Sequence, residues 1–309
     1  MNPNRTVIAA KIEQTEGTAE TLAAADADVL AFEPSFTLGV GIYERSELNA
    51  SLSPHELIPG SRMETIAFKV NLRGSGAAGT APKIGKLLKS CGFGETIVAS
   101  TSATYAPISI AIPTLTMSVY KDGSRKQIRG ARGTVSHSGK AGEPGVLSFS
   151  FQGVYDGVTD VAILTGTGIE TTNIPVLLSA GLSIASYAAI ISTISIDMGI
   201  TIEMRPDSNK SEGYVSCAYG GRKPVGSFDP EETLLATHDW YGRFIAGTSG
   251  ILAFHYGATA GNIITFNAPK VQYTNITESS RNGIAALDVP FALSRSTAAG
   301  DDEISVAFT

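Results

Sequence analysis

The feature that most constrains the fold of this chain is a diverged internal repeat. The segment Phe36–Arg45 resembles Ile196–Arg205, and each residue of the second segment lies 160 positions after its counterpart (36 to 196, 45 to 205). The residues that match across this offset are Gly39 and Gly199, Val40 and Ile200, Ile42 and Ile202, Arg45 and Arg205, and Arg62 and Arg222. A tandem duplication leaves an ordered series of matches of this kind, so we expect two related domains in one chain.

Each half also contains one short helical pattern. The first, Thr80–Gly92, has its expected N-cap at the threonine, Pro82 in its first turn and a glycine stop. The second, at 237–247, carries Asp239 where a carboxylate favours the helix dipole. Beyond the helices, Gly130–Ser136 resembles Asn267–Tyr273 and Gly145–Phe151 resembles Gly283–Val289, at a shorter offset (130 to 267, 145 to 283).

Alternating polar and apolar residues, rich in Ser, Thr, Val and Ile, predict strands through most of the chain. The strands expected in the first half are 29–43, 62–72, 114–121, 126–137 and 145–155. Those expected in the second half are 189–204, 222–228, 250–256, 262–267, 270–273, 283–293 and 304–308. We therefore predict a mainly β fold of two tandem β-sandwich or barrel-forming domains, 1–160 and 161–309, each with one short helix and joined around 156–172.

Composition excludes several classes of function. The formal net charge is −6, from 29 acidic and 23 basic residues, which is the wrong sign for a protein that grips nucleic acid through its phosphates. The N-terminal residues lack the apolar run of a signal peptide, and no stretch reaches the roughly 18 apolar residues of a membrane span. The two cysteines, Cys91 and Cys217, are too few for a disulfide framework or a zinc site, and Cys91 is expected to be a small buried residue.

No motif carries a catalytic signal. The four histidines are scattered, and no Gly-x-Ser-x-Gly elbow is present. The string Gly74–Gly79 matches Gly-x-Gly-x-x-Gly, but no βαβ unit with a following acidic residue surrounds it. The run Asp301–Glu303 lacks the alternating ligand spacing of a calcium loop. We therefore expect no enzyme activity, no metal and no cofactor.

Two long polar excursions, Tyr43–Pro59 and Pro206–Gly221, interrupt the strands at the same place in each half. Loops this long in a compact domain are usually functional or flexible, and in a self-assembling protein they can reach a neighbouring subunit. The candidates for contacts between subunits or rings are Arg45, Glu47, His55, Glu56, Asp207, Lys210 and Glu212.

Short motifs along nearly the whole chain resemble those of siphophage tail tube proteins. They are Lys11–Glu20, Leu72–Pro82 with the helix that follows, Gly130–Val135, Gly257–Asn262, Ala268–Gln272 and Gly300–Ile304. The resemblance implies β-sandwich domains whose strands, from several subunits, close a barrel around the tail lumen. A subunit with two tandem copies resembles those that build a pseudo-hexameric ring from three chains.

The same resemblance implies a role and partners. The chain would be a virion protein assembled in the host bacterial cytoplasm, without membrane contact. It would pack with itself and with tape-measure, tail-terminator and tail-tip proteins, while DNA passes through the lumen without specific binding. Strands 29–43, 62–72, 189–204 and 222–228 are the expected lumen barrel, and residues 1–28 and the last strand are expected to contact other subunits. The candidate acidic lumen residues are Glu33, Glu44, Asp197, Glu203 and Asp229.

Three other readings remain open at this point. A two-domain β-sandwich binding module or adhesin would share the composition but predicts an exposed aromatic cluster, whereas the single tryptophan, Trp240, falls in the second helix. Another tail ring or adaptor protein would share the motifs. An enzyme would need two carboxylates converging in a pocket, which no local spacing indicates.

Overall fold

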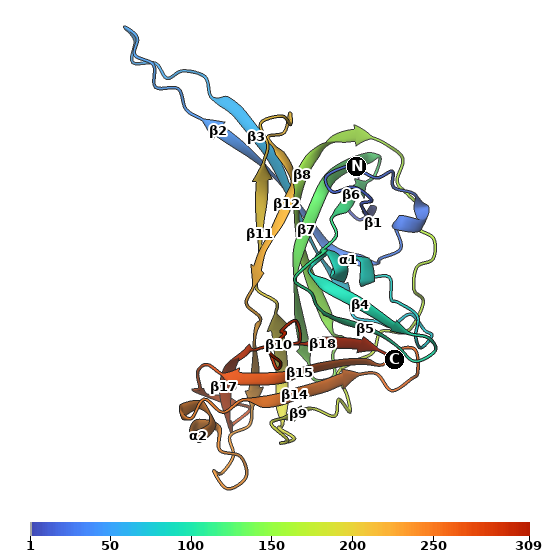
Figure 1. The fold of residues 1–309 in the computed structure, drawn as a ribbon, viewed down its shortest axis with the longest axis vertical. Coiled ribbons are helices and arrows are strands. Elements are labelled where there is room, and N and C mark those ends of the chain that lie inside the picture. The colour runs from blue at the N-terminus through green and yellow to red at the C-terminus, as the bar shows by residue number, and fades with distance from the viewer. Residues whose placement is uncertain (1) are drawn as a thin grey trace.

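The computed structural model describes residues 2–309 and is built around one continuous sheet that spans both halves of the chain (Figure 1). The first half contributes the strands β2 (Ala31–Tyr43), β3 (Ile58–Asn71), β8 (Val146–Asp160) and β7 (Ser124–Lys140), in that spatial order. The second half continues with β10 (Ile191–Asp197), β13 (Val225–Pro230), β17 (Ile284–Leu293) and β15 (Ile264–Tyr273). The order ends with β18 (Ser305–Phe308), β5 (Ser102–Pro107) and β4 (Phe93–Val98).

The remaining elements cover or extend this sheet. The other strands are β1 (Thr6–Ile12), β6 (Leu115–Lys121), β9 (Ser183–Ile184), β14 (Gly250–Tyr256), β16 (Thr277–Arg281) and the separate hairpin β11 (Ile200–Pro206)–β12 (Tyr214–Arg222). The helical elements are α1 (Gly85–Ser90), α2 (Trp240–Ile245) and one 3-10 turn, Ala24–Asp26. The predicted mainly β class is confirmed. None of the helices in the described part of the chain could span a membrane.

The core follows from strand alternation. Along β3, Ile66, Phe68 and Val70 are buried while the residues between them are half-buried, because successive side chains point to opposite faces. Phe68 stacks on Phe149 and Phe151 of β8, with ring centroids 5.7 and 6.1 Å apart. One connected set of buried apolar residues runs from here through both halves. The two halves therefore share a core as well as a sheet.

Several sequence predictions of elements were wrong in detail. The stretch after the first helix forms the hairpin β4–β5, which was not predicted. Helix α1 begins at Gly85 rather than near Thr80, and its N-cap residue makes no side-chain hydrogen bond. Helix α2 does use Asp239, whose carboxylate accepts a hydrogen bond from the Gly242 amide at 2.7 Å. Half of the predicted excursion 206–221, residues 214–221, belongs to strand β12, which leaves residues 207–213 as a loop.

The long hairpin β2–β3 has the same strand register as four strands of the second half, in which β10 pairs with β13 and β11 pairs with β12. Val40 faces Arg62, and Ile200 faces Arg222, so both strands keep the 160-residue offset (40 to 200, 62 to 222). The partners Ala31 and Val70 correspond in the same way to Ile191 and Pro230. In the first half, the pairing of β2 with β3 slips by one residue between 32 and 35 and again between 40 and 42. In the second half, the pairing slips in the same way between 191 and 194 and between 201 and 202. The same bulges at the same positions are what a duplicated hairpin retains.

The hydrogen-bond ladders also show which strands correspond next to these hairpins, β8 in the first half and β17 in the second. Phe149 faces Phe68, and Val289 faces Phe228. Phe68 corresponds to Phe228 at the 160-residue offset, so their partners Phe149 and Val289 also correspond. The sequence match had instead aligned Val289 with Phe151. The repeat therefore pairs β8 with β17 at an offset of 140 residues (149 to 289), two more than in the sequence match (145 to 283).

The halves meet edge to edge. Strand β10 pairs antiparallel with the end of β7, from Thr193 opposite Lys140 to Asp197 opposite Ser136. The last strand, β18, pairs with β15 of the second half and β5 of the first, so the C-terminal residues tie the halves together.

Candidate assembly surfaces

The described residues hold no group of three or more histidines, cysteines or acidic residues that could bind a metal. His137 is buried against Phe254 and Phe266 and shares a 2.9 Å hydrogen bond with the Tyr256 hydroxyl. Burial lowers the pKa of His137 to about 3, so the ring stays neutral. Cys91 and Cys217 are free and buried, and burial raises the pKa of both thiols, that of Cys217 to about 12. These groups suit packing and not nucleophilic chemistry.

The glycine-rich string Gly74–Gly79 holds the halves together. Asn262 accepts a hydrogen bond from the Gly74 amide at 2.7 Å, and the Gly261 carbonyl accepts one from Gly76 at 2.9 Å. A Cβ at Gly74 or Gly261 would collide with the backbone of the other half. The small residues therefore permit a close approach between the two halves, which explains the motif without a bound phosphate.

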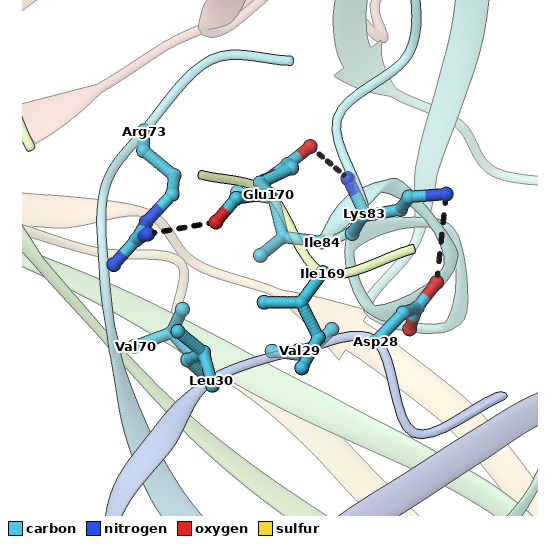
Figure 2. Close-up of a pocket in the computed structure, with 9 residues that line it drawn as sticks. All are labelled: Asp28, Val29, Leu30, Val70, Arg73, Lys83, Ile84, Ile169 and Glu170. Carbon is cyan, nitrogen blue, oxygen red and sulfur yellow. Dashed lines mark hydrogen bonds and ion pairs between the residues drawn. The ribbon is translucent and has the colours of Figure 1, made fainter. Parts of the chain in front are cut away.

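A small pocket lies where the connection between the halves crosses the first half (Figure 2). Ile169 lines it together with Val29 and Ile84. The Glu170 carboxylate accepts a 2.7 Å hydrogen bond from the Lys83 amide, and the Glu170 carbonyl accepts one from Arg73 at 3.1 Å. Burial raises the pKa of Glu170. These two hydrogen bonds anchor the connection to the first half.

Several strands keep an edge without a strand partner in the described chain, and three of them are long enough or exposed enough to matter for assembly. Strand β2 pairs with β3 alone, β16 with β17 alone, and β4 with β5 alone. Each presents a row of backbone donors and acceptors that another chain can pair with. Exposed Ile97 and Val98 lie on β4. A protein with such edges is suited to strand pairing with further copies or partners.

The outer part of β2–β3, with residues 44–57, projects away from the body of the molecule (Figure 1). Its exposed large apolar residues are Leu38, Ile42, Tyr43, Leu48, Leu52, Leu57 and Ile58. Four residues predicted for contacts lie here: Glu56 is exposed, Arg45 pairs with Glu47 at 3.0 Å, and the His55 ring lies 3.0 Å from the Glu47 carbonyl. Apolar side chains on an extended arm lose contact with water only when the arm packs on something else.

The second hairpin, β11–β12, lies against the first half instead of projecting. Glu212 forms an ion pair with Arg129 at 2.7 Å, and its carbonyl accepts a hydrogen bond from the Arg62 amide at 2.9 Å. Asp207 bonds within its own turn to Asn209, and Lys210 is exposed. Of the three residues predicted for contacts in this loop, Glu212 is therefore used inside the chain.

One face of the shared sheet is lined with small hydroxyl side chains. Directly opposite positions on neighbouring strands carry Ser150 and Thr134, Ser148 and Ser136, Ser138 and Ser195, and Ser195 and Ser227. This hydroxyl face crosses the joint between the halves and lies opposite the buried core side chains. Its two lysines are neutralised, Lys69 by Glu33 at 2.6 Å and Lys140 by Glu143 at 2.5 Å. The face is wettable and carries little free positive charge.

A comparison with models of protein families identifies the family of this chain. The family model described as "Phage tail tube protein" matches residues 3–307, nearly the whole chain. The chain belongs to the phage tail tube protein family. This confirms the resemblance found in the sequence motifs. A search of curated proteins found no match.

Membership makes this a structural subunit of a tail tube, a component of the virion tail that assembles with itself and with other tail components. Three of the acidic residues predicted to line the lumen lie at the hydroxyl face. Glu33 bonds Lys69, the Asp197 carboxylate accepts from the Gly199 amide at 2.9 Å, and Asp229 pairs with Arg281 at 2.9 Å. Glu44 and Glu203 are exposed farther out, beside or on the two hairpins. A lumen role for all five stays a prediction.

Sequence reasoning missed Glu64, a carboxylate on the core face of β3. Neither of its oxygens has a hydrogen-bond partner, and burial raises its pKa to about 8. Strand alternation alone indicates that residue 64 points inward, next to Ile66. The lack of a partner depends on β7 and β8 and could not be predicted locally.

Proposed function

We propose that three copies of this chain close into a pseudo-six-fold ring, and that stacked rings form the tail tube through which DNA leaves the capsid. The observation that carries this proposal is the shared register of β2–β3 and β10–β13, bulges included. Two units with one hairpin geometry can occupy equivalent places in a ring. The unpaired edges at β2 and β16 support closure, because closing a ring removes such edges.

The hydroxyl face supplies the lumen wall in this proposal. DNA presents one phosphate charge per about 1.7 Å of axis, and free lysines or arginines would hold it by releasing counterions. Lys69 and Lys140 are each paired with a carboxylate, so they offer little attraction. Serine and threonine keep the wall wetted without fixing a strong field. Glu33 and Asp229 balance Lys69 and Arg281, and Asp197 adds negative charge along the same surface, which favours sliding.

The projecting tip, residues 44–57, makes the contact between stacked rings in this proposal. Leu48 and Leu52 are fully exposed on a segment without strand structure. A tip of this kind can pack on the ring above or below and bury those side chains. Rings at the two ends of the tube would meet the tail-terminator and tail-tip proteins, and the tape-measure protein would occupy the lumen during assembly in the host cytoplasm.

Negative-stain electron microscopy of the purified protein, with its solution mass measured alongside, tests this function. We expect hollow rings or tubes whose ring mass corresponds to three chains of 32.1 kDa. A compact monomer that never polymerises, even at high concentration and with tail-tip complexes added, would contradict the proposal and favour a two-domain binding module. Rings that never stack would instead favour a tail ring or adaptor protein.

A further inference from the structure

The strand pairing that joins the two halves of this chain suggests how two chains can pair through the equivalent strands. Within the chain, β10 of the second half pairs with the end of β7 of the first, and Ser195 lies opposite Ser138. Each of these strands has a counterpart in the other half. The counterpart of β10 is β2, at the 160-residue offset shown by their hairpin registers.

The counterpart of the end of β7 is β16. Ser136 faces Ser148 of β8, and Thr277 faces Asp288 of β17. Because Val289 corresponds to Phe149, Asp288 corresponds to Ser148, and Thr277 therefore corresponds to Ser136. Continuing along both strands, Ser279 corresponds to Ser138 and Arg281 to Lys140. The two counterparts, β2 and β16, both have an unpaired edge in the described chain.

We propose that β2 of one chain pairs antiparallel with β16 of a second copy, in the register of the internal joint. Ser35 would lie opposite Ser279, Glu33 opposite Arg281, and Thr37 opposite Thr277. This inference rests on the proposed function in taking a second copy of the chain as the partner. It goes further by fixing which edges meet and which residues face one another.

Burial at equivalent positions supports this joint independently of strand pairing. Met198, just beyond β10, is 4% exposed against the first half, whereas its counterpart Leu38 is 48% exposed. Cys217 of β12 is fully buried, with its sulfur 2.8 Å from the Gln152 carbonyl, whereas its counterpart Leu57 is 57% exposed. The first half covers these positions in the second hairpin. An equivalent surface, the second half of a preceding chain, would cover Leu38 and Leu57.

The chemistry of the two edges fits a joint that forms only in an assembly. Residues 277–280 of β16 are exposed and carry no large apolar side chain, so the free edge attracts few other partners. Glu33 and Arg281 would place opposite charges at directly facing positions, beside the partners they hold within each chain, Lys69 for Glu33 and Asp229 for Arg281.

Cysteine cross-linking tests the register. A chain carrying Ser35→Cys and Ser279→Cys is assembled, oxidised and run on a non-reducing gel, with electron microscopy of the same sample. Facing residues of antiparallel strands have Cβ atoms about 4.5–5.5 Å apart, near enough for a disulfide after a small shift. We expect covalent dimers and trimers that stop at the trimer, because three chains close the ring. The native Cys91 and Cys217 are buried and do not compete.

Three controls make the result decisive. The shifted pair Ser35→Cys with Ser280→Cys places the thiols on opposite faces and should give little cross-link. Each single variant should give no trimer. The pair Ser138→Cys with Ser195→Cys should close within one chain, which shows that the chain is folded and that facing positions of this ladder can be bridged.

The outcomes separate this joint from the ring itself. Visible rings without the Ser35–Ser279 cross-link, or with the shifted pair cross-linking as well, would overturn the joint and leave the ring proposal standing. Cross-linked chains that grow beyond the trimer would support the joint and contradict the three-chain ring. Neither rings nor cross-links, with the internal control closing normally, would overturn both.

Discussion

Arg129 of the first half and Glu212 of the second hairpin form a half-buried ion pair whose nitrogen and oxygen lie 2.7 Å apart. Arg129 also bonds Asp156 at 3.1 Å and the Gly17 carbonyl at 3.0 Å, so one guanidinium holds three segments far apart in sequence. The ion pair is one of the contacts that hold β11–β12 against its own chain, while the equivalent β2–β3 hairpin projects. The position of the second hairpin therefore depends on its contacts with the first half, and not on the hairpin alone.

Removing this pair should loosen the second hairpin. We expect Arg129→Met to lower the free energy of unfolding by about 3 kcal/mol, since it leaves Glu212 and Asp156 without their cation. Glu212→Gln should cost less, because Arg129 keeps its other partners. Limited proteolysis should cut at 207–213 faster in both variants. Lys140→Gln, which breaks an exposed pair, should change stability by less than about 1 kcal/mol and serves as control. Equal effects of all three variants would contradict the role of Arg129.

The free energy of unfolding should depend on pH through two buried groups, Glu64 and His137, whose pKa values are shifted in opposite directions. The pKa of Glu64 is raised from 4.5 to about 8, so the folded state holds a proton that the unfolded state loses, and stability falls as pH rises through that window. The pKa of His137 is lowered from 6.5 to about 3, so stability falls as pH drops below 6.5. The two slopes oppose each other between pH 4.5 and 6.5. We therefore expect maximal stability there, measured as denaturation midpoints across pH.

Variants of Glu64 separate its titration from its polarity. Glu64→Gln should flatten the loss of stability above pH 6.5, since an amide does not titrate. Glu64→Met should also raise stability at pH 8, by about 1–3 kcal/mol, because it removes an unsatisfied polar group from the core. A wild-type protein whose stability rises from pH 6.5 to 8 would contradict the raised pKa.

Leu57 should matter for assembly and not for folding. Leu57→Asp puts a charge where the neighbouring chain is expected to cover an apolar side chain, so we expect rings to be lost while the melting temperature of the monomer changes little. Ile110→Asp, at an exposed residue outside the hairpin, is the matched control and should leave ring formation intact. Normal ring formation by the Leu57 variant, observed by sedimentation and microscopy, would argue against this docking surface.

The tip of the same hairpin should affect stacking alone. Replacing residues 46–55 with a short Gly-Ser linker should give single rings that do not lengthen into tubes, because the exposed Leu48 and Leu52 are lost. Microscopy counts of rings against tubes measure the effect. Tubes of normal length from this variant would show that the rings stack through another surface.

The sequence predicted the mainly β fold class because that class follows from local alternation. It also predicted the internal repeat from matches such as Gly39 with Gly199, and the shared strand registers support that prediction. It did not predict β4–β5, whose Ser/Thr-rich strands are fixed by pairing with β18 from the far end of the chain. Nor did it predict that Cys217 would be buried within a segment taken as an excursion, because the covering surface comes from the first half. Among the predicted contact residues, Glu212 is engaged by Arg129, 83 positions away, which no local pattern indicates.

Cryo-electron microscopy of assembled tubes, at a resolution that separates strands, tests the central claim most directly. We predict rings of three chains with six similar units, and a continuous lumen sheet in which β2 of each chain pairs with β16 of the next and the hydroxyl face points inward. Rings of six chains, or a lumen lined by the opposite face of this sheet, would contradict the account.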